Sequence, residues 1–97
     1  MNTFECDKAK AKSNFEKHNL KFTDAARGIK AGFALTAKSP LSDEHDEERN
    51  LSIIGRAGRR AMVAIWTPRG GNVRLISVRH ARDKEQEAFD AYIRQTN

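Results

Sequence analysis

The chain has 97 residues, one cysteine and a formal net charge of +5, which limits both its architecture and its partners. This length allows one modest hydrophobic core, so a single domain over residues 1–97 is expected. One cysteine excludes a disulfide framework and a CxxC metal site, and a reducing cytoplasm is the expected location. The charge favours nucleic acid or an acidic protein as partner, and no apolar run approaches the length needed to cross a membrane.

Two helices are predicted in the first third of the chain. Asp7 is suited to cap a helix that runs to about His18, where Asn19 can take the left-handed conformation that ends helices. Thr23 is predicted to cap a second, shorter helix that ends at Gly32. The helical part of this region therefore ends near residue 32.

Four strand-like segments follow these helices. They cover residues 33–38, 49–57, 62–67 and 73–80. An acidic loop, residues 43–48, lies between the first two segments, and turn-like sequences at 58–60 and 68–72 separate the others. Because such short turns cannot cross over to a parallel neighbour, the segments predict an antiparallel meander.

A last helix is predicted from about residue 83 onward. Asp83 and Gln86 have the spacing of a capping box, and an apolar stripe follows them. The stripe consists of Ala88, Phe89, Tyr92 and Ile93. The order helix, helix, four strands, helix indicates an α+β domain with helices packed on a four-stranded antiparallel sheet.

Arginine is concentrated in one part of the chain. Residues 51–82 contain seven arginines and no Asp, Glu or Lys. Ordinary surfaces mix both signs of charge, so a long acid-free segment indicates a positive field directed at an anion. A guanidinium group binds phosphate through two parallel hydrogen bonds and keeps its charge when partly buried. RNA or DNA is therefore the first ligand to expect, and an acidic protein is the alternative.

The meander predicts that the arginines gather at two opposite ends of the sheet. One group holds Arg56, Arg59, Arg60, Arg79, His80 and Arg82, and the other holds Arg49, Arg69 and Arg74. Because side chains alternate along a strand, Arg74 and Arg79 are expected to face opposite sides of the sheet unless a bulge intervenes. That alternation would prevent the two arginines from belonging to the same site.

Five short motifs, in this order, resemble those of a known family. They are Phe4-Glu5-Cys6-Asp7 against F-E-W-D, Asn14 with Lys17 and His18 against N-x-x-K-H, Phe22 with Asp24 and Ala25 against F-x-D-A, Glu48-Arg49 against E-R, and Arg74 to Arg79 with Ala81 and Glu85 against R-I-I-S-A-R-x-A-x-x-x-E. The family is the BrnT toxins, the ribonuclease halves of a bacterial toxin–antitoxin pair. The resemblance extends over nearly the whole chain.

This resemblance implies a RelE-like fold, cleavage of RNA and inhibition of translation. It also implies a BrnA-type antitoxin that buries the active surface and carries the DNA-binding domain, so DNA would be contacted only through the complex. The chain departs from the family pattern at Cys6, Val78, Gln86 and Phe89, where Trp, Ala, Arg and Tyr are usual. The absent arginine at position 86 removes one positive charge near the expected site, whereas the other departures resemble changes in packing.

RNA can be cleaved by attack of its own 2′-hydroxyl, which needs neither a metal nor a cofactor, and neither is expected here. Cations fixed around the phosphate stabilise the charge that develops on it, typically by a few kcal/mol per donor. Arg79, Arg74 and Arg49 are the candidates for this role, with Lys17 as a further cation. Arg56, Arg59, Arg60 and Arg82 are predicted to bind the RNA backbone outside the reacting centre.

Proton transfer requires a different residue type. His18 is the candidate because the family motif covers it and because histidine titrates near neutral pH. The alternative is a packed histidine, since Lys17 and His18 both suit the C-terminal end of a helix. Glu85 is predicted either to orient Arg79 for the phosphate or to form a purely structural ion pair with it.

Other functions remain open from the sequence. The acidic loop could suggest a metal site, but neighbouring loop residues rarely converge on one ion, so a solvated loop is expected. A basic surface of this kind also suits a non-catalytic protein that binds nucleic acid. A third possibility is a subunit whose arginines pair only with an acidic protein partner.

Overall fold

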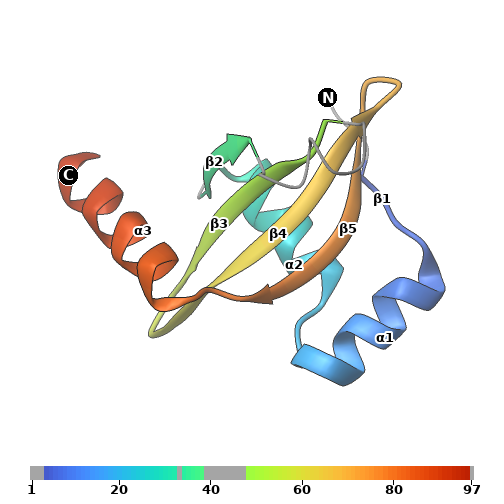
Figure 1. Ribbon diagram of the computed structural model, residues 1–97, viewed down its shortest axis with the longest axis horizontal. Coiled ribbons are helices and arrows are strands. Elements are labelled where there is room, and N and C mark those ends of the chain that lie inside the picture. Colours follow the sequence, from blue (N-terminus) through green and yellow to red (C-terminus); the bar gives the residue numbers. More distant parts are fainter. Residues whose placement is uncertain (1–3, 33, 39–47, 97) are drawn as a thin grey trace.

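The computed structural model describes residues 4–32, 34–38 and 48–96 (Figure 1). The elements are β1 (Phe4–Glu5), α1 (Lys8–His18), α2 (Phe22–Lys30), β2 (Ala34–Lys38), β3 (Asn50–Arg56), β4 (Arg59–Arg69), β5 (Asn72–His80) and α3 (Asp83–Thr96). The predicted α+β class is confirmed, and after the short β1 the elements follow the predicted order of two helices, four strands and a last helix. No helix within these described ranges is long and apolar enough to span a membrane.

The sheet differs from the prediction by one strand. Its order is β1-β5-β4-β3-β2, and β1 pairs with β5 in parallel while the other neighbours are antiparallel. The sheet is therefore mixed and five-stranded rather than antiparallel and four-stranded. A strand of two residues is too short to show any alternation of polar and apolar side chains, which is the signal on which a sequence prediction of strands depends.

The N-terminal helices begin and end at identifiable residues. Asp7 caps α1 as predicted, because its Oδ1 accepts from the backbone N–H groups of Ala9 and Lys10 at 2.8 and 3.3 Å. Asn19 ends α1 in the left-handed conformation, with φ of 57°. The predicted cap at Thr23 is wrong: α2 already begins at Phe22, and its N-terminal end has no side-chain cap.

A buried asparagine attaches α1 to the edge of the sheet. Asn14 donates from Nδ2 to the carbonyl oxygen of Val78 at 2.7 Å and accepts from the Val78 N–H at 3.1 Å. The amide therefore replaces a neighbouring strand on the part of β5 that the short β1 does not reach. Figure 1 shows α1 beside β5 as a result.

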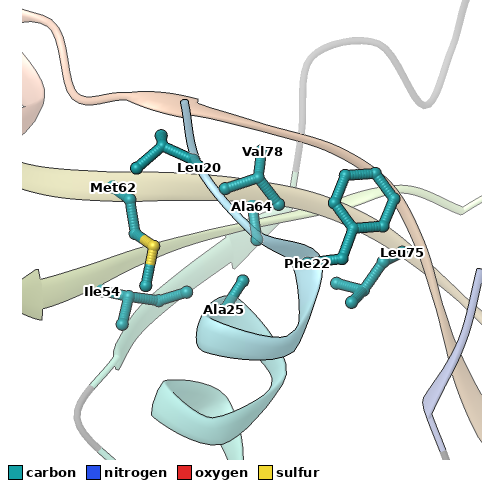
Figure 2. Close-up of a cluster of buried hydrophobic side chains, with 8 residues drawn as sticks. All are labelled: Leu20, Phe22, Ala25, Ile54, Met62, Ala64, Leu75 and Val78. Carbon is teal, nitrogen blue, oxygen red and sulfur yellow. The ribbon is translucent and has the colours of Figure 1, made fainter. Parts of the chain in front are cut away.

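Hydrophobic clusters cover both faces of the sheet. One lies on the side of α2, here called the helical face (Figure 2), and comprises Leu20, Phe22, Ala25, Ile54, Met62, Ala64, Leu75 and Val78. The other lies on the side of α3, here called the α3 face, and comprises Ile53, Ala61, Val63, Ile65, Ala81 and Phe89. Consecutive residues of β4 alternate between the two clusters, as expected for a strand buried on both faces.

A β-bulge in β5 determines which side chains share a face. Ile65 pairs with Ser77, but the next residue, Trp66, pairs with Leu75, so Ile76 has no partner in β4. Leu75 and Val78, three residues apart, consequently both lie in the helical-face cluster, and Ile76 packs on the α3 face. The extra residue reverses the alternation between them.

The bulge changes the expected positions of two arginines. Arg74 precedes Leu75 and Arg79 follows Val78, and both of these apolar neighbours point to the helical face. Alternation on either side of the bulge therefore places Arg74 and Arg79 together on the α3 face. The sequence predicted that the two arginines face opposite sides of the sheet unless a bulge intervenes, and the structure contains such a bulge.

Two-residue turns connect the long strands. Gly70 and Gly71 both have positive φ, 57° and 86°, as a type I′ hairpin turn requires. The other turn is formed by residues 57 and 58, because Arg56 pairs with Arg59. The prediction that Arg59 and Arg60 sit in the turn is therefore wrong, and both begin β4.

The start of α3 is fixed by side chains from two directions. The predicted capping pair of Asp83 and Gln86 is wrong: Glu85 Oε1 accepts instead from the Arg82 N–H at 2.8 Å. Gln86 Oε1 accepts from the Ala61 N–H at 2.7 Å, which ties α3 to β4. These bonds hold the first turn of α3 against the sheet.

Candidate functional site

A cationic hollow of about 420 Å³ lies where β3 begins, β4 ends and β5 begins. Its lining includes Lys10, Arg49, Thr67, Arg69, Arg74 and Ile76. Among the described residues, no acidic side chain lines it. The predicted gathering of Arg49, Arg69 and Arg74 at one end of the sheet is confirmed.

The sequence reasoning did not assign Lys10 to this site. Lys10 reaches the hollow because Asn14 holds α1 against β5. The sequence contained one indication of this position, which is the spacing of Lys10 from Lys17, a residue already expected at the site. Residues seven apart on a helix share one face, so Lys17 lies on the same side of α1 as Lys10. His18 is seven residues after Ala11, which packs on the helical-face cluster, so His18 lies toward that cluster, about 100° around the helix from Lys17.

Glu5 partly balances the charge of the hollow. It stands beside Arg74 in the parallel pairing of β1 with β5, and the two side chains form an ion pair of 3.8 Å. Glu5 also accepts from Asn72 Nδ2 at 2.8 Å. Roughly a third of each charged side chain is exposed, 31% for Arg74 and 32% for Glu5, so the pair contributes about 1 kcal/mol or less. A phosphate can therefore compete for Arg74.

Arg79 forms a closer pair with Glu85 at the other end of β5. Its Nη1 and Nη2 donate to the two carboxylate oxygens of Glu85 at 2.7 and 2.9 Å, and Nη1 also donates to the carbonyl oxygen of His80 at 3.2 Å. The hydrogen bonds that Arg79 donates to Glu85 raise the pKa of Arg79 and lower the pKa of Glu85, in both cases against the opposing effect of burial. Both groups are therefore ionised at neutral pH.

The geometry of this pair leaves part of Arg79 available. Within the described residues, the Nε–H and the second Nη2–H of Arg79 make no hydrogen bond. These two donors lie on one edge of the planar guanidinium, the arrangement that binds two oxygens of a phosphate. Glu85 thus fixes the orientation of Arg79 from one edge and leaves another edge for an anion.

The predicted proton-transfer residue is not joined to this pair. The carbonyl oxygen of His18 lies 3.2 Å from His80 Nε2, and His80 points away from the α3 face by alternation after Arg79. Across the part of the chain that the structure describes, no hydrogen bond or ion pair links His18 or Lys17 to Arg79. Of the two, Lys17 is on the side of α1 that adjoins the cationic hollow.

The four predicted RNA-backbone arginines are divided between two places. Arg60 donates to the carbonyl oxygen of Ala81 at 3.0 Å and pairs with Asp83 at 3.1 Å, so it joins β4 to the start of α3, next to Arg82. Arg56 and Arg59 instead border a second hollow beneath α3. The predicted gathering of these side chains at one end of the sheet is thus found, but in two separate environments.

The predicted acidic loop falls largely outside the described residues, which resume at Glu48. The Glu48 carbonyl oxygen accepts from Thr67 Oγ1 at 2.6 Å, and this bond positions the chain just before Arg49. In the described ranges there is no group of three or more His, Cys, Asp or Glu side chains placed to hold a metal ion.

Comparison with known proteins identifies the family. The family described as "Ribonuclease toxin, BrnT, of type II toxin-antitoxin system" matches residues 6–85, most of the chain. The crystal structure of the Brucella abortus ribonuclease toxin BrnT superposes with a TM-score of 0.64 at 22% identity, covering 86% of this chain and 100% of that one, and so shares its fold. No curated protein sequence matches the chain. The chain therefore belongs to the BrnT family of ribonuclease toxins of type II toxin–antitoxin systems, which implies an RNA substrate and an antitoxin partner.

Proposed function

We propose that this toxin is a metal-independent endoribonuclease that inhibits translation by cleaving RNA on its α3 face through attack of the 2′-hydroxyl. The observation that carries the proposal is the bulge at Ile76, which places Arg74 and Arg79 on one face of the sheet. Without the bulge, β5 would present these arginines to opposite faces. With it, one RNA strand can contact both.

The two arginines act on different phosphates. They are five residues apart, so their Cα atoms are separated by about 15 Å along the strand. Glu5 draws Arg74 toward β1, and Glu85 draws Arg79 toward α3. We therefore assign the phosphate at the cleaved bond to Arg79 and a neighbouring phosphate to the cationic hollow, where Arg49 and Arg74 act with the other lining cations.

Arg79 stabilises the additional negative charge that develops on the reacting phosphate. Its unused edge offers two donors at a fixed angle, and such fixed donors are typically worth about 3 kcal/mol of transition-state stabilisation. Glu85 is a positioning residue in this scheme. Its lowered pKa keeps the carboxylate ionised, so that it continues to hold Arg79 at the pH of the cytoplasm.

Lys17, rather than His18, is assigned to the RNA side of α1. It is on the same side of the helix as Lys10, and its exposed ammonium can approach the RNA backbone. His18 fits the alternative role of a packed histidine at a helix end. We expect His18→Ala to lower thermal stability modestly and to preserve cleavage, and a fully folded but inactive variant would return proton transfer to His18.

A cytoplasmic BrnA-type antitoxin is proposed as the protein partner, with DNA contacted only through the complex. A non-catalytic nucleic-acid-binding protein is the alternative, because the cationic hollow alone would also bind RNA.

The test is cleavage of an RNA oligonucleotide by the purified toxin in excess EDTA. The matched substrate carries one 2′-deoxynucleotide at the cleaved position. We expect the RNA to be cut and the substituted strand to be bound but not cut at that position. Cleavage of the substituted strand, or a requirement for added divalent metal, would contradict the proposed chemistry. Salt-sensitive binding of both strands without cleavage would favour the alternative.

A further inference from the structure

We propose that the second hollow, between α3 and the β3–β4 hairpin, binds an acidic segment of the antitoxin that also carries an apolar side chain. This hollow is here called the α3 groove. Its floor is formed by Ala61, Phe89 and Ile93, and its rim by Arg56, Arg59 and Arg94. The inference rests on the family of the toxin and does not depend on how RNA is cleaved.

The α3 groove is an open hollow of about 470 Å³. In Figure 1, α3 begins beside the β3–β4 hairpin and then diverges from the sheet. The ring of Phe89 fills the space above Gly55 and is 8% exposed, whereas Ile93, one turn further along, is 37% exposed. Ile93 is one of two large apolar side chains exposed in the described part of the chain, and the other is Phe15 on α1. The floor can therefore accept an apolar side chain from a partner.

The rim carries positive charge for which the described part of the chain provides no ion pair. Among the described residues, the side chains of Arg56, Arg59 and Arg94 form no ion pair or hydrogen bond. By contrast, Arg60 and Arg79 are each paired with an acid of α3. Three guanidinium groups that form no ion pair with the described residues, around an apolar floor, are complementary to an acidic peptide with an apolar anchor.

The lining argues against RNA as the occupant. Asp90 also lines the groove, where its Oδ1 accepts from Gln86 Nε2 at 3.0 Å, so the groove holds one carboxylate beside its three arginines. Bases bind proteins by stacking on exposed aromatic faces, but the ring of Phe89 is buried and Ile93 offers no flat surface. The Arg56 and Arg59 side chains, predicted from sequence to contact RNA, are therefore assigned here to the antitoxin.

The charge also argues against a second copy of the toxin. A symmetric dimer would place the same surface of both copies in contact, so the arginines of one rim would meet those of the other. Like charges facing each other in an interface are strongly unfavourable. An acidic chain of different sequence fits, and a type II toxin has such a candidate in its antitoxin.

The test compares two groove variants with two matched controls in the purified toxin–antitoxin complex. Ile93→Ala removes the apolar contact, and Arg94→Glu reverses one rim charge in the last turn of α3. Phe15→Ala removes the other exposed apolar side chain, and Arg27→Glu reverses an exposed arginine in the last turn of α2. Thermal unfolding checks that each variant is folded, and Arg94→Gln replaces Arg94→Glu if the reversed charge prevents folding.

We expect Arg94→Glu to weaken antitoxin binding by at least about tenfold and Ile93→Ala by several-fold, with little effect of either control. In cells, the groove variants should remain toxic but be neutralised less well by the co-expressed antitoxin. Three results would overturn the proposal. In the first, both groove variants bind the antitoxin with an affinity within twofold of the wild type. In the second, the groove variants lose RNA binding while their antitoxin affinity is unchanged. In the third, the groove variants change the oligomeric state of the toxin alone. Loss of RNA cleavage in the wild type would leave the antitoxin measurement intact, so the two proposals can fail separately.

Discussion

Arg79 is held by Glu85 in a geometry that serves orientation as well as charge balance. Two donors of the guanidinium are bound to the carboxylate and two others are left along one edge. The sequence predicted this pair from the spacing of a motif and left open whether it is structural or catalytic. It could not predict which edge of the guanidinium stays available, because that depends on where α3 begins relative to β5.

Removing Glu85 should therefore reduce turnover while leaving substrate binding nearly unchanged. We expect Glu85→Ala to lower kcat by about tenfold to a hundredfold, because the guanidinium loses its fixed orientation. Glu85→Gln should lose less, since the amide oxygen can still accept one hydrogen bond from Arg79. Single-turnover cleavage rates and KM of the three proteins provide the measurement. Wild-type kcat in folded Glu85→Ala would show that the pair is only structural.

The pair should also make stability depend on pH in a defined direction. The hydrogen bond from Arg79 lowers the pKa of Glu85 below its ordinary value of 4.5, so the folded state binds this proton less tightly than the unfolded state. The resulting stabilisation is fully present above that ordinary value and is lost as the pH falls through the lower, folded-state pKa. Arg79 titrates far above this range, and its raised pKa adds no dependence there.

Urea unfolding of wild type and Glu85→Gln at pH 7 and at pH 3 tests this effect. We expect the wild type to exceed the variant in free energy of unfolding by about 1 kcal/mol at pH 7, and the difference to shrink at pH 3. Comparing the two proteins removes the contribution of other carboxylates. A difference that is equal at both pH values would contradict the assigned coupling.

At the scale of elements, local signals predicted the three helices and the four longer strands, because apolar stripes and glycine turns depend on residues close in sequence. They missed the two-residue β1, and they misplaced the caps of α2 and α3 and one of the turns. The bulge at Ile76 cannot be predicted from the sequence, because Leu75, Ile76 and Val78 are all apolar and either face of the sheet would accept them. Only the pairing of β5 with β4 shows which residue is unpartnered. The shared face of Arg74 and Arg79 was unpredictable for the same reason.

The packing of α3 on the sheet depends on a glycine. A Cβ atom at Gly55 would lie 2.6 Å from Cζ and 2.8 Å from Cε2 of Phe89, both far too close. We expect Gly55→Ala to destabilise the protein by about 1–3 kcal/mol, because the ring and with it α3 must shift. Cleavage should fall as well, since α3 carries Glu85.

A double variant separates this effect from a general loss of stability. Phe89→Leu makes room for the added methyl group, so Gly55→Ala should cost less in the Phe89→Leu background than in the wild type. Chemical denaturation of the two single variants and the double variant gives the comparison. Strictly additive losses would show that the contact does not determine where α3 lies.

Across the whole molecule, the positive charge is arranged in patches of different character. The cationic hollow has no acidic lining residue among those described, and one of its arginines, Arg74, lies on the same strand as Arg79. The α3 groove combines arginines with an apolar floor. The net charge predicted an anionic partner, but it could not separate a surface for RNA from one for a protein. The distinction depends on side chains that come together only when the sheet forms.

The salt dependence of RNA binding tests the role of the cationic hollow. For single strands, each phosphate contact contributes about 0.7 to the slope of log affinity against log salt concentration. We expect Lys10→Ala and Arg69→Ala each to reduce the magnitude of the slope by about 0.7, measured with 2′-O-methyl RNA to prevent cleavage. Lys12→Ala is the control, because Lys12 is exposed and two residues from Lys10, on a different side of α1. An equal reduction by Lys12→Ala would indicate diffuse attraction instead of a defined site.

The most direct test of the central claim is RNA cleavage in excess EDTA by the wild type, Arg74→Ala and Arg79→Ala, each checked for folding. The claim is that the bulge in β5 brings both arginines to one RNA strand. We predict cleavage by the wild type, a loss of at least about a hundredfold in kcat for Arg79→Ala, and mainly a higher KM for Arg74→Ala. Wild-type kcat and KM in either folded variant would contradict a site that extends along the α3 face from Arg74 to Arg79.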